Sequence, residues 1–116
     1  MTHENTLTLA KAMSEAELQS TVMDYAATVG WLCHHARKTR HASGKVSTPI
    51  QGHKGFPDVV FARTGRLVIV EFKSHRGTLS PEQRAWAAVL GSISGIELYV
   101  WRPLDWLDDT IERILR

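Results

Sequence analysis

The stretches GFPDVVF and LVIVEFK each carry charged residues where buried strands usually avoid them. Asp58 begins the strand of the first stretch, and Glu71 and Lys73 end the second. Side chains alternate between the two faces of a strand, so Glu71 and Lys73 are expected on the same face. The intervening Thr64-Gly65 pair predicts a hairpin, which brings the start of one strand beside the end of the other. The three charged groups are therefore expected to converge at one edge of a sheet.

Two carboxylates beside an ammonium group are suited to a hard divalent cation. Mg²⁺ is commonly held by one or two carboxylates, with waters and substrate phosphate oxygens completing its shell. Lysine cannot ligate while protonated, but it can orient an attacking water and stabilise the charge that develops on phosphorus. A salt bridge of Lys73 with Glu71 or with Asp58 is the simpler interpretation, and the triplet alone leaves both the site and the salt bridge open.

A further carboxylate is expected from a helix over residues 14–29. Ser14 and Glu17 have the spacing of a capping box. Apolar residues then recur at helical intervals: Leu18, Val22, Ala26 and Val29. With about 100° of rotation per residue, Glu15 falls on this apolar, core-facing stripe and Glu17 does not. Glu15 is therefore the better candidate for the site, although it would also favour the positive end of the helix dipole without any such role.

The elements around these residues follow the order α-β-β-β-α-β-α. WLCHHA, DVVFAR, LVIVEFK and IELYVWR are predicted strands. SPEQRAWAAVLGSISG is a predicted helix with Ser80 as N-cap and Gln83 three residues later, and a terminal helix opens at Pro103 and is expected to close an edge of the sheet. Residues 1–13 show no clear periodicity and are expected to form a flexible leader, with residues 14–116 as a single domain.

A basic loop of about twenty residues, RKTRHASGKVSTPIQGHKG, follows the first predicted strand. No acidic residue occurs between Tyr25 and Pro57, whereas several lie near the C-terminus. Loops this long in a small domain are usually functional or mobile. The cations expected to contact the phosphates of a nucleic acid are Arg37, Lys38, Arg40, Lys45 and Lys54. A solvated loop without a partner is the alternative.

The composition excludes several classes of protein. No apolar run approaches the ~18 to 20 residues that span a bilayer, so no membrane role is expected. Cys33 is the single cysteine and cannot form an internal disulfide, which favours a reducing, cytoplasmic setting. His34 and His35 are adjacent and fall on opposite faces of a strand, so a zinc site is not expected either.

The charged motifs resemble those of a known nuclease superfamily. Pro57-Asp58 followed by EFK at residues 71–73 resembles the PD-(D/E)XK nucleases, and the longer runs KGFPD (residues 54–58) and LSPEQ (residues 79–83) are similar to its VRR-NUC branch, the virus-type replication-repair nucleases. The similarity extends from about Ser14 to Arg102. It implies an α/β fold with a three-layer, restriction-endonuclease-like αβββαβ core and a mixed sheet, to which this chain adds a C-terminal helix.

The resemblance also implies roles for individual residues. Asp58 and Glu71 would bind Mg²⁺ together with the main-chain carbonyl of Phe72, and Lys73 would act on the nucleophilic water. Mn²⁺ would substitute for Mg²⁺. Glu15 would be the acidic residue of the first helix.

Gln83 corresponds to the glutamine that follows the EXK strand in the family. The resemblance implies that Gln83 assists the catalytic lysine or contacts the DNA backbone. Its position three residues after Ser80 equally predicts a simple capping partner for the helix.

Small members of the superfamily resemble Holliday-junction resolvases, which act in DNA repair as homodimers that cut branched DNA. The resemblance therefore implies a Mg²⁺-dependent deoxyribonuclease that is specific for branched DNA and dimeric. Trp101 and Trp106 flank the last predicted strand-helix junction, where they would either anchor a dimer or pack the terminal helix on the sheet. The alternative functions are a nucleic-acid-binding module without catalysis and a nuclease subunit that needs a partner.

Overall fold

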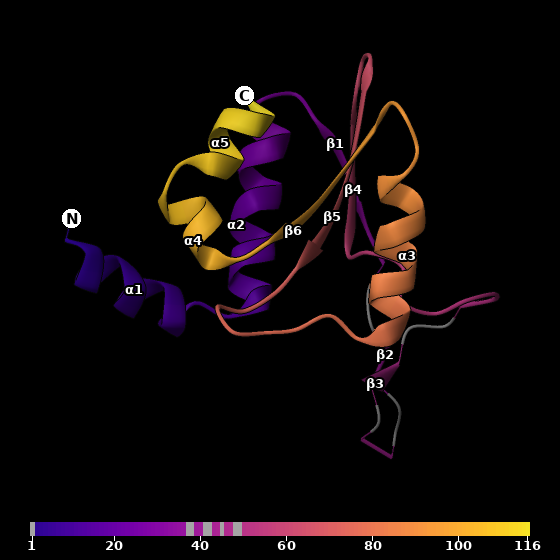
Figure 1. The fold of residues 1–116 in the computed structure, drawn as a ribbon, viewed down its shortest axis with the longest axis horizontal. Helices are drawn as coiled ribbons and strands as arrows, with labels where there is room; N and C mark the ends of the chain where they lie inside the picture. The colour runs from indigo at the N-terminus through magenta and orange to yellow at the C-terminus, as the bar shows by residue number, and fades with distance from the viewer. Residues whose placement is uncertain (1, 37–38, 41–42, 45, 48–49) are drawn as a thin grey trace.

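The computed structural model describes residues 2–36, 39–40, 43–44, 46–47 and 50–116 (Figure 1). The helices are α1 (His3–Ala12), α2 (Glu15–Thr28), α3 (Pro81–Gly91), α4 (Pro103–Leu107) and α5 (Thr110–Leu115). The strands are β1 (Leu32–His35), β2 (Thr39–Arg40), β3 (Val46–Ser47), β4 (Val59–Arg63), β5 (Arg66–Phe72) and β6 (Ile96–Trp101). None of the described helices combines the length and the apolar content that crossing a membrane requires.

The main sheet is mixed and has the strand order β1-β4-β5-β6. β4 is antiparallel to both β1 and β5, whereas β5 and β6 run parallel. The predicted hairpin between β4 and β5 is confirmed, with Val59 opposite Val70 and with Gly65 at a φ of 82° in the turn. The parallel pair requires a crossover, which α3 provides.

Helices cover both faces of this sheet, so the predicted three-layer α/β architecture is confirmed (Figure 1). α2, α4 and α5 lie on one face, and α3 packs against β6 on the other. The main core lies between α2 and the sheet, where Leu18 and Val22 pack with Val68 and Val70. Because residues alternate along β5, Ile69 and Glu71 face the α3 side.

The N-terminal residues differ from the expectation. Residues 3–12, which were expected to lack a regular element, form α1, and α1 packs against α4. The side chain of Thr2 caps the helix by accepting a hydrogen bond from the N–H of Asn5 (3.2 Å). Ala10 is the one residue of α1 that is fully buried, and so small a contact face gives the sequence no strong apolar stripe. The predicted division of the chain at residue 14 stays a prediction.

The C-terminal region also differs from the expectation. The predicted terminal helix is divided into α4 and α5 at Asp109, which has a left-handed φ of 67°. The expectation that it closes an edge of the sheet is wrong, because Ile111 and Leu115 of α5 are fully buried in the core beside α2.

Side chains from β4, from β5 and from the residue before β1 hold the end of α5 in this position. The indole N–H of Trp31 donates to the carbonyl of Leu115 (2.7 Å), to which Arg63 also donates (3.2 Å). Arg66 donates to the carbonyl of Ile114 (2.9 Å). The last carbonyls of a helix lack partners within the helix and carry the negative end of its dipole, so these donors stabilise the packed arrangement.

The tryptophans at the β6–α4 junction pack within the chain. Trp101 belongs to the buried core and contacts the rings of Phe72 and Tyr99. Trp106 is partly buried and makes an edge-to-face contact with Tyr25, with ring centroids 5.8 Å apart. The interpretation as packing residues is therefore confirmed, and Trp101 is not available to anchor a dimer.

Candidate active site

The start of β4 and the end of β5 lie side by side, and Asp58 immediately precedes β4. The backbone N–H of Phe72 donates to Oδ2 of Asp58 at 2.7 Å, which fixes the carboxylate against the neighbouring strand. Nδ1 of His35 on β1 lies 2.9 Å from the carbonyl oxygen of Asp58, so the imidazole can donate to that carbonyl from the other side. Asp58 is thus held by the two strands that flank β4.

Glu71 lies near the end of β5, between β4 and β6, and is only 5% exposed. Burial raises the pKa of Glu71 to about 9, and the raised pKa is reinforced by a side-chain hydrogen bond with Asp58 and by the negative charge of Asp58. The Lys73 ammonium opposes this shift, and the charge of Glu15 adds to it. Without a bound cation, Glu71 therefore retains its proton at neutral pH.

Lys73 completes the charged cluster. Its Nζ lies 4.0 Å from Oε2 of Glu71, and both side chains are largely buried. The backbone N–H of Lys73 donates to the carbonyl of Trp101 (3.0 Å), so pairing with β6 continues past the end of β5. The predicted convergence of Asp58, Glu71 and Lys73 at one edge of the sheet is confirmed as geometry, while their catalytic roles stay predictions.

The two acidic residues at the start of α2 have different environments. Glu17 forms a capping box with Ser14: it accepts from the N–H of Ser14 (3.1 Å), and this hydrogen bond lowers the pKa of Glu17. Glu15 is exposed, which differs from its expected core-facing position, yet its charge raises the pKa of Glu71. The structure therefore brings Glu15 near the cluster and assigns Glu17 to the helix cap.

Gln83 forms the predicted capping box of α3. Its side-chain Oε1 accepts from the backbone N–H of Ser80 (2.9 Å), while the backbone N–H of Gln83 donates to the Ser80 hydroxyl (3.1 Å). The capping interpretation is confirmed, and the additional role at the site stays a prediction.

Most of the basic residues proposed to contact DNA lie outside the part of the chain that the structure describes. Arg37, Lys38 and Lys45 are outside the described residues, and the structure describes only the backbone of Arg40, in the short β2–β3 pair. Lys54 is described: its exposed side chain lies 3.5 Å from Glu82 of α3.

The residues of the cluster fit a divalent cation. Glu71 is protonated beside a second carboxylate, so a cation would replace that proton and remove the repulsion between the two charged groups. Within the described residues, no group of three His, Cys, Asp or Glu side chains is placed to hold a metal. Asp58 and Glu71 would therefore supply two ligands, and main-chain, water or phosphate oxygens would supply the remainder.

The sequence did not predict the contact of His35 with Asp58 or the position of Arg102 near the site. His35 contacts the carbonyl of Asp58 because β1 pairs with β4 in a register that places it beside Val59. Arg102 directly follows β6, whose end lies beside the end of β5. Parallel pairing of β5 and β6 could have placed Arg102 near the site, since parallel neighbours end at the same edge of a sheet.

The comparisons with known proteins agree with this geometry. A family model described as the VRR-NUC domain matches residues 9–102. The chain belongs to the VRR-NUC family. No match is found among curated proteins or among solved structures. Membership of the VRR-NUC family implies a nuclease-type fold, and Asp58, Glu71 and Lys73 lie within the matched residues.

Proposed function

We propose that this VRR-NUC protein is a metal-dependent deoxyribonuclease that hydrolyses phosphodiester bonds, with a preference for branched DNA. The observation that carries the proposal is the convergence of Asp58, Glu71 and Lys73 at one edge of the sheet, where the pKa of Glu71 is raised to about 9. A strongly perturbed acid beside a second carboxylate and a lysine is typical of a catalytic site. A purely structural ion pair would not require the second carboxylate.

Each residue of the cluster has a chemical task in this proposal. Asp58 is oriented through Oδ2 by the N–H of Phe72, so its remaining lone pairs can face a ligand. Glu71 loses its proton when positive charge is present and then binds as a carboxylate. Lys73 positions the attacking water and stabilises the negative charge that develops on the phosphate. Mg²⁺, or Mn²⁺ in its place, would supply Lewis acidity that offsets charge on the non-bridging oxygens.

A homodimer is part of the proposal. A four-way junction has two-fold symmetry, and paired symmetric cuts need two sites related by a two-fold axis. The outer side of α3 supports this part, because Val89 is 61% exposed and Phe56 and Ile93 are exposed nearby. Apolar side chains gathered on one surface are typical of a protein interface. The dimer would then hold two copies of the proposed active site, as symmetric cleavage of a junction in DNA repair requires.

Cleavage of labelled DNA tests the proposal. Four-way junction, flap, single-stranded and linear duplex substrates are incubated with Mg²⁺ or Mn²⁺, with EDTA as the metal-free control. Asp58→Asn keeps an acceptor for the N–H of Phe72 but removes the charge, and the matched control is Asp24→Asn, which changes an exposed position of α2. Asp58→Asn is expected to lower the cleavage rate by at least ~100-fold.

The outcomes separate the alternatives. Cleavage by Asp58→Asn at the rate of the unchanged protein would show that the cluster is not catalytic. Binding of every substrate without cleavage would replace the proposal with a nucleic-acid-binding module or a subunit that needs a partner. Metal-dependent cleavage with equal rates on linear and branched substrates would retain the nuclease and remove the branched-DNA preference.

A further inference from the structure

Residues 73–80 connect β5 to α3 and carry positive charge directly beside the candidate site. Figure 1 shows this connection crossing the edge of the sheet where β5 ends, from the side of α4 to the start of α3. It contains Lys73, His75 and Arg76 and no acidic residue. The segment that leaves the site therefore carries two basic side chains, Lys73 and Arg76, and no acidic residue that would offset them.

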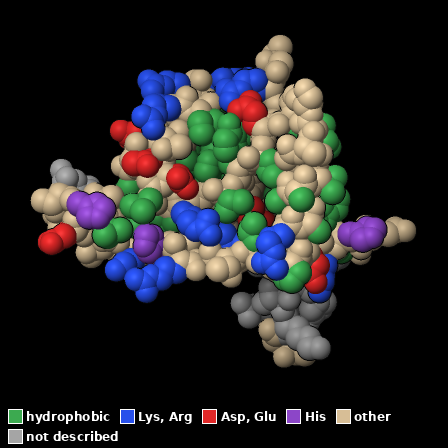
Figure 2. Space-filling model, in the orientation of Figure 1, with side chains coloured by type: hydrophobic (Ala, Val, Ile, Leu, Met, Phe, Trp, Pro, Cys, Tyr) green, Lys and Arg blue, Asp and Glu red, His purple; other side chains and the backbone are tan. Residues whose placement is uncertain are grey.

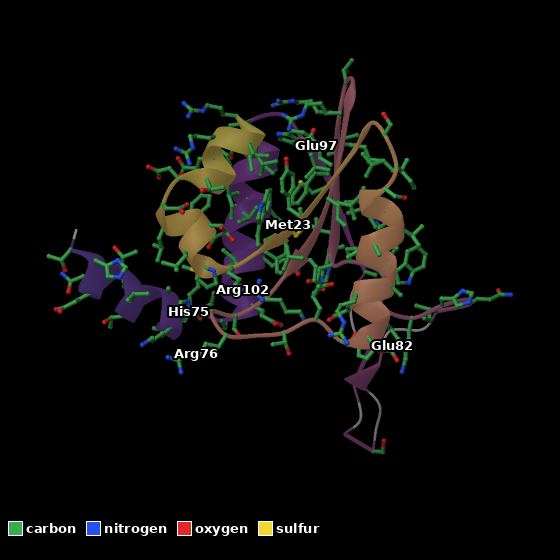
Figure 3. All side chains as sticks on the ribbon, viewed as in Figure 1. Met23, His75, Arg76, Glu82, Glu97 and Arg102 are labelled. Atoms are coloured by element: carbon green, nitrogen blue, oxygen red, sulfur yellow. The ribbon has the colours of Figure 1, made fainter. Side chains whose placement is uncertain are left out.

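Two further arginines are attached to the backbone of this segment. Arg102, at the end of β6, donates to the carbonyl of Gly77 (2.6 Å), and Arg84 of α3 donates to the carbonyl of Leu79 (2.8 Å). In the view of Figure 3, Arg102, His75 and Arg76 lie in one region of the molecule. The cations thus come from three separate parts of the chain and meet along one short segment.

The first part of the segment is a tight turn. The N–H of Gly77 donates to the carbonyl of Ser74 (3.2 Å), and a Cβ at Gly77 would lie 3.0 Å from Oγ of Ser74 and 3.4 Å from Cδ of Lys73. His75 and Arg76 occupy the two central positions of this turn. A packed turn holds its side chains in place before a ligand arrives, which reduces the entropy lost on binding.

The arginines of this region have no carboxylate partner among the described residues, unlike Lys54 and Arg66. Lys54 is paired with Glu82, and Arg66 with Glu97, at 3.5 and 2.6 Å. Among the described residues, no carboxylate oxygen lies within 4.0 Å of the guanidinium groups of Arg76, Arg84 and Arg102. Asp105 lies near Arg102 but accepts from its backbone N–H (2.7 Å). Nδ1 of His75 is enclosed and has no hydrogen-bond partner within the described part of the chain.

We propose that residues 73–80, with Arg84 and Arg102, form a binding surface for the sugar-phosphate backbone of a nucleic acid. Arginines without a carboxylate partner, on and beside an ordered turn, match phosphate oxygens in charge and in hydrogen-bonding geometry. The inference rests on the proposed nuclease function, since it places the bound strand across the edge that holds Glu71 and Lys73. It adds a contact surface that is independent of the basic loop at residues 36–54.

The surface lies on the same side of the molecule as the edge of the sheet. Figure 2 shows several separate groups of Lys and Arg side chains on this face, some in the lower half of the view and others at its top. Like charges gathered in one region repel one another and raise the free energy of the unbound protein. A polyanion that follows the segment would remove this repulsion and release condensed counterions.

The test measures binding in EDTA, where no metal-dependent cleavage can occur. Fluorescence anisotropy of a short fluorescein-labelled duplex and of the corresponding single strand gives the Kd across ~50 to 200 mM NaCl. The variants are Arg76→Gln, Arg84→Gln and their combination, because both side chains are exposed and their loss should leave the fold intact. The matched control is Arg113→Gln, which removes the same charge from an exposed position of α5, on the opposite side of the molecule (Figure 1).

Each of the two substitutions is expected to make the slope of log Kd against log salt shallower by about 1 and to weaken binding several-fold. Arg113→Gln should leave the slope unchanged. An unchanged slope in the combined variant, an equal change in Arg113→Gln, or no binding of either probe by the unchanged protein would overturn the inference.

The same proteins distinguish this inference from the proposed function. Asp58→Asn should bind with the slope of the unchanged protein and fail to cleave in Mg²⁺. A protein that cleaves normally while the combined variant keeps its slope would retain the nuclease and lose the binding surface. A protein that never cleaves but whose slope falls in the combined variant would retain the binding surface and lose the nuclease.

Discussion

Glu71 is buried among groups that favour its protonated form, and this arrangement has a measurable cost. Its pKa is raised from the usual 4.5 to about 9, chiefly by burial and by Asp58. In the unfolded chain the proton leaves near the usual value, so the folded state binds more protons over this interval. The stability that the protonated form contributes is therefore fully present below pH 4.5 and is lost as the pH rises toward 9.

Replacing Glu71 with glutamine tests this cost in the metal-free protein. Gln keeps the shape and the hydrogen-bonding capacity of the protonated acid and cannot ionise. We expect Glu71→Gln to raise the free energy of unfolding by about 1 to 3 kcal/mol near neutral pH, so that the variant unfolds at a higher urea concentration. This gain in stability should grow toward pH 9. Urea unfolding in EDTA across this interval measures it. Parallel stability curves for the two proteins would contradict the raised pKa.

Binding of a divalent cation at Asp58 and Glu71 should be visible without catalysis. A ligand that binds only the folded state stabilises it, by about 2.7 kcal/mol at one hundred times its Kd. We expect Mg²⁺ and Mn²⁺ to raise the Tm of the unchanged protein and of Asp24→Asn. In Asp58→Asn the increase should be largely lost, because one of two carboxylate ligands is gone. Equal increases in all three proteins would place the cation elsewhere.

Gly55 links the loop that precedes Asp58 to α3. It has a left-handed φ of 98°, and a Cβ there would lie 2.7 Å from the backbone carbon of Glu82. Gly65, in the β4–β5 turn, also has a left-handed φ, of 82°, but nothing lies within 4 Å of its Cβ position. Comparing substitutions at Gly55 and Gly65 therefore separates the cost of backbone strain from the cost of steric contact.

Alanine at these two glycines should have different consequences. Gly65→Ala is expected to cost about 1 to 2 kcal/mol from the left-handed backbone alone. Gly55→Ala should cost roughly 1 to 3 kcal/mol more, because the Glu82 backbone must move. Urea unfolding compares the two variants directly. Equal losses of stability would show that α3 moves away from Gly55 at little cost.

Elements with local signals are the ones that the sequence predicts well. The helix starts at Ser14 and Ser80 are confirmed with both hydrogen bonds of each capping box, since a cap depends on residues only three apart. The break at Asp109 was not predicted, because a continuous apolar period crosses it and only packing of α5 beside α2 makes the division favourable. The contact of His35 with Asp58 was not predicted for the related reason that it depends on strand register.

At the scale of the whole molecule, the proposal requires two copies of the chain. A two-fold dimer should have twice the 13.0 kDa mass of one chain. The exposed apolar side chains on α3 provide a surface that a second copy could cover, and a charge there would oppose its burial. We therefore expect light scattering to give the dimer mass for the unchanged protein and the monomer mass for Val89→Lys.

Leu32→Lys is the matched control for this experiment, because Leu32 is 79% exposed on the edge strand β1, away from α3. If the dimer forms through α3, Val89→Lys should also convert paired symmetric cuts in a four-way junction into independent single cuts, while each site keeps its chemistry. Dissociation by Leu32→Lys alone would move the interface to β1, because a free edge strand can pair with a second copy. A monomer that still makes paired cuts would show that symmetry in the protein is not needed for them.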